Sequence, residues 1–175
     1  MPLVADSSIL IHASKNPRLL SIVKGIADKV LIPPAVRQET VERGKELGKT
    51  DAITLEGLLE EGFIEVVALG REAQDLKGRL LATRRLGVGE VEAIALAKER
   101  RIAIILMDDQ LASKAAKAVG LRPRPLTNLL VAARMKRDIS PAEALAILDE
   151  MVRRGYRLSS EDYLQVKTAI ERVAS

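Results

Sequence analysis

The stretch IAIILMDDQLA, residues 102–112, joins an aliphatic run directly to two adjacent aspartates, Asp108 and Asp109. A short, wholly apolar run is typical of a strand that helices cover on both faces, and such a strand excludes carboxylates. We therefore expect a strand at Ile102–Met107, with the aspartates at its carboxyl end and negative charge at the rim of the core. A helix over Leu111–Val119 should follow, with one of the aspartates as its N-cap.

Three further short apolar stretches are predicted as strands: Leu3–Ala5, Val30–Ile32 and Ile64–Val67. Helical patterns separate them, and the strands show no alternation of polar and apolar residues. Strands that alternate with helices pair in parallel in a layered α/β fold. The sequence therefore predicts an α/β protein with a central parallel sheet of four to five strands.

Helix starts are marked by short capping patterns. Asn16 is predicted to cap a helix that has Pro17 at its first position. Gly87 and Gly89 lead into an alanine-rich helix over Glu90–Arg101.

Residues 127–175 are predicted to be helical throughout. Ser140, Pro141 and Glu143 form a capping box, and a second helix starts at Ser159 or Ser160. We expect this tail to pack on the same core, or to act as a dimer or regulatory element, and not to form a separate domain.

The composition limits the possible functions. The 175 residues suit one domain with an extension, and the aromatic share of 2% requires an aliphatic core and argues against base-stacking platforms. The absence of cysteine excludes disulfides, thiolate zinc sites and cysteine nucleophiles. A net charge of +4 permits a nucleic-acid partner that is bound through its phosphates. No signal peptide or membrane-spanning run is expected, and a cytoplasmic location fits.

Five acids fall near the predicted carboxyl ends of the strands, where parallel α/β sheets bind their ligands. Asp6 follows the first strand, Glu39 lies on the helix after the second, Glu90 opens the helix before the fourth, and Asp108 and Asp109 end the fourth. Converging carboxylates repel one another unless protons or cations neutralise them. Mg²⁺ and Mn²⁺ prefer such oxygens, and a bound metal can activate water against a phosphodiester.

Each of these acids also has an ordinary explanation. Asp6 and one of the paired aspartates can cap helices, Glu90 suits a helix N-terminus, and Glu39 can be a surface acid. Glu92 is two residues from Glu90 and should point elsewhere, toward a second shell or solvent. The sole histidine, His12, is expected at the surface or in a loop.

Lys114 follows the paired aspartates on the next predicted helix, together with Lys117. Cations on a helix usually form a solvated face. Their functional interpretation is a positive rim that holds phosphates around the acids.

Four motifs in this order, VADSSIL, IPPAVRQE, LGVGEVEAIALAKE and IILMDDQLASKAAKAVGL, resemble the PIN-domain family over residues 3–126. The resemblance extends to its prokaryotic VapC-like branch of toxin ribonucleases. It implies a three-layer α/β/α Rossmann-like fold, with a PIN-like domain over 1–126 and a helical C-terminal extension over 127–175. It also implies a Mg²⁺- or Mn²⁺-dependent endoribonuclease, often a homodimer and often held inactive by a small antitoxin.

The resemblance assigns the four family acids to Asp6, Glu39, Glu90 and Asp108, with Asp109 as a close rival of Asp108. Asp6, Glu90 and Asp108 would bind the metal. Glu39 would complete the shell or orient the attacking water, and cleavage would leave a 5′-phosphate and a 3′-hydroxyl.

Two hydroxyl residues complete the resemblance. Ser8 fits the small residue two positions after the first acid, and Thr127 fits a threonine after the last strand. The glycine expected after that threonine is absent, since Asn128 and Leu129 stand there. The alternative is a PIN-like RNA-binding or scaffold protein with weak catalysis, which the intact set of acids argues against. A nucleotide-binding Rossmann protein is less favoured, because GVGE is not a GxGxxG turn.

Overall fold

Five parallel strands form one sheet within residues 1–83 and 85–172, the part of the chain that the computed structural model describes. The strands are β1 Pro2–Ala5, β2 Lys29–Ile32, β3 Ile64–Val66, β4 Ile104–Leu106 and β5 Arg122–Arg124. Their order is β3-β2-β1-β4-β5, so the strand order reverses between β1 and β4. The predicted parallel α/β fold is confirmed, and its topological switch point lies between these two strands.

The two strands at the switch point are in direct register. Val4 of β1 pairs with Leu31 on one side and with Ile105 of β4 on the other. The backbone N–H of Asp6 donates to the carbonyl of Leu106 at 3.2 Å. The acids that follow β1 and β4 therefore start from neighbouring points at one edge of the sheet.

Strand β5 was not predicted, because it does not coincide with an apolar stretch as the other four strands do. Its sequence is Arg-Pro-Arg, and only Pro123 is buried. It is an edge strand, where proline is tolerated, and the Arg122 N–H donates to the carbonyl of Ala103 at 2.7 Å. A strand with one buried side chain leaves no hydrophobic pattern to detect.

The helices of the described residues include those predicted to start at Pro17, Glu90, Leu111 and Ser159 or Ser160, each within two residues of the expected position, while the predicted helical tail is interrupted at 136–140 and 154–159. They are α1 Ser7–Ser14, α2 Pro17–Ile26, α3 Pro34–Arg37, α4 Arg43–Glu46, α5 Thr50–Glu60, α6 Arg71–Leu81, α7 Val88–Glu99, α8 Gln110–Ala118, α9 Leu126–Met135, α10 Pro141–Arg153 and α11 Ser160–Arg172. Asn16 caps α2, and Ser140 and Glu143 form the capping box of α10, as predicted. Helix α1 was not predicted, because its start signal is Asp6 itself. Residues 173–175 of the predicted tail lie outside the described residues.

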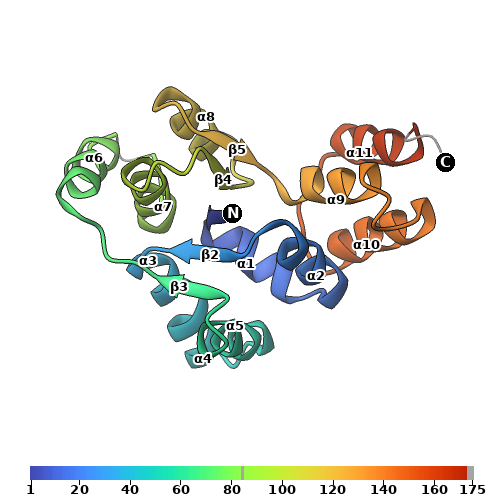
Figure 1. The fold of residues 1–175 in the computed structure, drawn as a ribbon, viewed down its shortest axis with the longest axis horizontal. Coiled ribbons are helices and arrows are strands. Elements are labelled where there is room, and N and C mark those ends of the chain that lie inside the picture. Colours follow the sequence, from blue (N-terminus) through green and yellow to red (C-terminus); the bar gives the residue numbers. More distant parts are fainter. Residues whose placement is uncertain (84, 173–175) are drawn as a thin grey trace.

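Helices lie on both faces of the sheet (Figure 1). Helix α7 contacts α6, α8 and β4, whereas α1 contacts α2 and α5. Every residue from Val91 to Ala97 is buried, which is typical of a helix enclosed on all sides. Its small alanines let neighbouring elements approach this helix closely.

Helices α9, α10 and α11 gather at one end of the molecule beside α2 (Figure 1). The side-chain amide of Asn16 donates to Glu150 Oε2 at 2.9 Å, which ties the start of α2 to α10. Within the described residues, no helix is long and apolar enough to span a membrane.

Candidate active site

Asp6 is the most deeply buried acid of the candidate site. Its side chain is 2% exposed, and its Oδ1 accepts a hydrogen bond from the Ile9 N–H at 2.9 Å as the N-cap of α1. Burial raises the pKa of this carboxyl from 3.8 to about 7, and the negative charges of Asp108, Glu90 and Asp109 add to the shift. Four of the five predicted acids therefore lie close enough to interact through their charges.

Asp108 is held firmly through one of its two oxygens. Oδ1 accepts from the Tyr156 hydroxyl at 2.6 Å and from the Leu126 N–H at 3.2 Å. Oδ2 is buried and has no hydrogen-bond partner among the described residues. Burial raises the pKa of this carboxyl, although both hydrogen bonds oppose the shift. A buried carboxylate oxygen without a donor is costly unless water or a cation meets it.

Asp109 serves a different purpose from its neighbour. It is exposed, and its Oδ1 accepts from the Ala112 N–H at 2.8 Å as the N-cap of α8. The prediction that one of the two aspartates caps this helix is confirmed. Asp108 is the one that faces the interior.

Glu90 lies in the first turn of α7. Its Oε2 accepts from the Gly87 N–H at 2.9 Å, which completes a capping box. Burial raises its pKa, the hydrogen bond to Gly87 opposes this, and the charges of Asp109 and Glu39 raise it further.

Glu39 reaches the same helix start from the opposite side. It lies in a π-helical turn, Gln38–Glu42, between α3 and α4, and such turns are frequent at functional sites. Its Oε1 accepts from the Gly89 N–H at 3.1 Å, and its Oε2 accepts from the Ser7 hydroxyl. A Cβ added at Gly89 would collide with the Glu39 carboxylate. Gly89 is therefore the residue that lets this acid approach α7.

Glu92 is buried away from the other acids. Its Oε2 accepts from the Ala35 N–H at 3.0 Å, and its Oε1 pairs with Lys77 at 2.7 Å. The carboxylate thus joins the start of α3 to α6 and α7. This fits a structural role beneath Glu39.

The hydroxyl and cationic candidates lie in three different settings. Ser8 is exposed, and it is the neighbouring Ser7, missed by the sequence reasoning, whose hydroxyl contacts an acid. Lys114 is exposed and lines a cavity of about 450 Å³ together with Leu86 and Leu111. Leu86 and Leu111 are close in sequence to Glu90 and Asp109, but in the described part of the chain none of the five acids lines this cavity.

Thr127 lies beneath an aromatic residue that the sequence did not indicate. It is buried, and its side chain lies beside the hydroxyl of Tyr156. The ring of Tyr156 meets His12 edge-on, with 5.1 Å between the ring centroids. His12 is on α1 and half-buried, and not in a loop as expected. Tyr156 stands between arginines in the sequence RRGYR, so no local pattern predicts its burial.

The donor set has the chemistry of a hard-cation site. Its acids supply only carboxylate oxygens, Asp108 Oδ2 has no partner in the described part of the chain, and the pKa values of Asp6, Glu90 and Asp108 are raised. Within residues 1–83 and 85–172, no three His, Cys, Asp or Glu side chains form a ready-made metal cluster. Capping bonds hold several of the carboxylates in their present directions. The carboxylate donors and their negative charge therefore fit Mg²⁺ or Mn²⁺.

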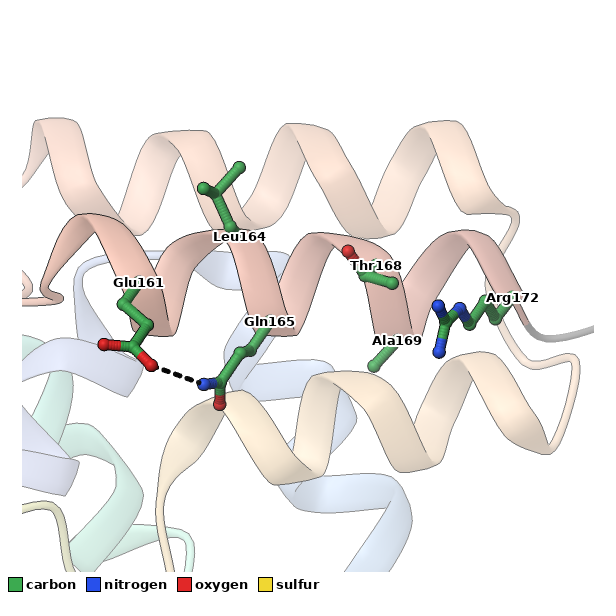
Figure 2. Close-up of a pocket in the computed structure, with 6 residues that line it drawn as sticks. All are labelled: Glu161, Leu164, Gln165, Thr168, Ala169 and Arg172. Carbon is green, nitrogen blue, oxygen red and sulfur yellow. Dashed lines mark hydrogen bonds between the residues drawn. The ribbon is translucent and has the colours of Figure 1, made fainter.

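A hollow of about 680 Å³ lies elsewhere, along one face of α11 (Figure 2). Its lining comes entirely from this helix, and Leu164 points outward and is 60% exposed. Since α11 is at the far end of the molecule from α7 (Figure 1), this surface does not belong to the acid site.

Comparison with known families adds one finding. A family model described as a PIN domain matches residues 2–172, which includes α9, α10 and α11. No curated protein matches the chain.

Proposed function

Because this chain belongs to the PIN-domain family, whose members are generally nucleases, we propose that it is a Mg²⁺- or Mn²⁺-dependent endoribonuclease. The observation that carries the proposal is the convergence of Asp6, Glu90 and Asp108 at the switch point of the sheet. Burial raises the pKa of Asp6 to about 7, and Asp108 Oδ2 lacks a partner among the described residues. A set of buried acids that destabilises the protein when charged is expected where a cation belongs.

Each acid has a separate task in this proposal. Asp6, Glu90 and Asp108 hold the metal, with Asp109 beside them. The metal supplies Lewis-acid activation of the phosphoryl group and of the attacking water. Glu39, held by Ser7 and Gly89, accepts a proton from that water or orients it.

The substrate is bound mainly through its phosphates. Lys114 is exposed on α8, the helix that Asp109 caps, and it would hold the RNA backbone on that side. In-line hydrolysis would leave a 5′-phosphate and a 3′-hydroxyl. Ser8, which is exposed two residues after Asp6, would contact the substrate. Thr127 and Glu92 would support the acids.

The resemblance to the VapC-like branch supports a finer role. In that role the protein is a cytoplasmic homodimer and the toxin of a toxin–antitoxin pair, with a small antitoxin as its inhibitor. A short gene for a DNA-binding protein directly upstream would support this role. A gene neighbourhood of RNA-processing factors would favour the RNA-binding or scaffold alternative.

The test is cleavage of end-labelled, mixed-sequence RNA by the purified protein with Mg²⁺, with Mn²⁺ and with EDTA. Asp6→Asn and Asp108→Asn should abolish metal-dependent cleavage, whereas Asp149→Asn, a change on α10, should not. Single-stranded DNA of the same sequence serves as the substrate control. Cleavage that survives in EDTA, or in both site variants, contradicts the proposal.

A further inference from the structure

Tyr156 connects the C-terminal helices to the acid site. It follows Gly155, which ends α10 with a positive φ of 92°, and its N–H donates back to the Met151 carbonyl at 2.9 Å. Glycine is favoured in this left-handed position, so the sequence turns the chain sharply at the end of the helix. The tyrosine that follows is 6% exposed and is directed into the protein.

The hydroxyl of Tyr156 is bonded to the acid site. It donates its single proton to Asp108 Oδ1 at 2.6 Å, and the buried side chain of Thr127 lies beside it. The edge-on packing against His12 of α1 fixes the ring.

These contacts place the two carboxylate oxygens of Asp108 in different environments. Oδ1 is occupied by Tyr156 and by the Leu126 N–H, whereas Oδ2 is buried and without a donor among the described residues. A carboxylate held by two donors on one oxygen has little freedom to rotate. Its other oxygen is then presented in one fixed direction.

We propose that Tyr156 is a positioning residue, which fixes Asp108 through Oδ1 so that Oδ2 would be available to hold the metal. This inference rests on the proposed function, and it makes the C-terminal extension a part of the nuclease centre. Residues that hold a metal ligand from behind usually change metal affinity on the order of 10–100-fold when they are removed.

The test uses Tyr156→Phe, which keeps the ring and its contact with His12 but removes the hydroxyl. Calorimetric titration with Mn²⁺ in the absence of RNA should show affinity weakened on the order of 10-fold or more. Cleavage should require correspondingly more Mn²⁺ and should recover when Mn²⁺ is raised. The matched control is Tyr163→Phe, which removes the other tyrosine hydroxyl, bonded to Asp149 on α10, and should leave both quantities unchanged.

A spectroscopic measurement tests the same contact in the protein with Tyr156 intact. The chain has no tryptophan and two tyrosines, so Tyr163→Phe leaves Tyr156 as the only tyrosine. Its emission should change on titration with Mg²⁺ and saturate, and Asp108→Asn should abolish the change. If Tyr156→Phe fails to fold, this measurement still tests the positioning role of Tyr156.

The outcomes separate the two proposals. A wild-type protein that neither binds Mn²⁺ nor cleaves RNA overturns the proposed function. If the wild type binds and cleaves, unchanged Mn²⁺ affinity in Tyr156→Phe overturns the positioning role alone. An unchanged Tyr156 emission on Mg²⁺ binding does the same.

Discussion

The acid site has two sides that are built differently. On the strand side, Asp6 and Asp108 follow β1 and β4 and are enclosed by the core and by Tyr156. On the helix side, Glu39 and Glu90 lie at the first turn of α7 and accept backbone N–H groups of Gly89 and Gly87. Asp6 and Asp108 also accept N–H groups at helix starts, from Ile9 of α1 and from Leu126 of α9, so helix N–H donors do not distinguish the two sides. The comparison teaches that the difference is burial: charging the acids costs more on the strand side, where Asp6 is almost fully enclosed.

The largest expected effect comes from the strand side. Asp6→Asn and Asp108→Asn keep the shape of the side chain but remove a charge, and kcat/KM for RNA should fall on the order of 10³-fold. Asp109→Asn is the matched change next door. It retains the cap of α8 and should cost far less. Steady-state cleavage assays measure kcat/KM for all three variants. Equal losses of kcat/KM in Asp108→Asn and Asp109→Asn would contradict the different roles given to the two aspartates.

The second effect concerns stability and pH. The pKa of Asp6 rises from 3.8 to about 7 on folding, so between these values the native state holds a proton that the unfolded state has lost. The free energy of unfolding should therefore fall as pH rises through this window, by about 2 kcal/mol between pH 5 and pH 7 for this group alone.

Urea denaturation of the protein in EDTA measures this dependence. Asp6→Asn should flatten the curve and stabilise the protein at pH 8, because the buried charge is gone. Added Mg²⁺ should stabilise the wild type at pH 8 but have little effect on the variant. A wild-type stability that rises from pH 5 to pH 7 would contradict the strand-side account.

The third effect tests the helix side. Gly89→Ala should displace the Glu39 carboxylate, because the new methyl group occupies its position, and cleavage should fall about 10-fold. Stability should change by less than about 1 kcal/mol, since the displaced group is the end of a flexible side chain.

The matched control is Gly57→Ala on α5, where a Cβ meets nothing within 4 Å. It should leave cleavage unchanged and stabilise the protein by roughly 0.5–1 kcal/mol. Thermal melts and cleavage assays on both variants make the comparison. Full activity in Gly89→Ala would show that Glu39 has no role in cleavage.

The smallest effect separates two adjacent serines. Ser7→Ala removes the hydroxyl that holds Glu39 and should lower cleavage by a few fold, about 1 kcal/mol. Ser8→Ala changes an exposed hydroxyl that is proposed to contact RNA, so it should raise KM and leave kcat unchanged. The ratio of the two activities, measured on the same RNA, shows which serine supports the helix side.

Much of this site could be predicted from local sequence. Asp6 and Glu90 stand at element boundaries that an apolar run or a glycine pair marks, and the capping box of Ser140 and Glu143 is visible in four residues. The parallel sheet followed from the alternation of short apolar runs with helices, and it is confirmed. Local patterns succeed wherever neighbouring residues determine the structure.

The rest depended on contacts between distant residues. Nothing in DD tells which aspartate turns inward, because the partner of Asp108 is Tyr156, 48 residues further on. Ser7 and Ser8 differ only in which one faces the π-helical turn that carries Glu39. Strand β5 exists because its backbone completes the edge of the sheet and not because its side chains are apolar.

The hydrogen bond between Tyr156 and Asp108 also has a consequence for synthesis. A growing chain exposes every carboxylate of the site well before residue 156 leaves the ribosome. The contact that fixes Asp108 can form only after α10 has folded back onto α9, so it is among the last long-range contacts to become available. The order of the sequence thus delays completion of the acid site until the segment that carries Tyr156 has been made.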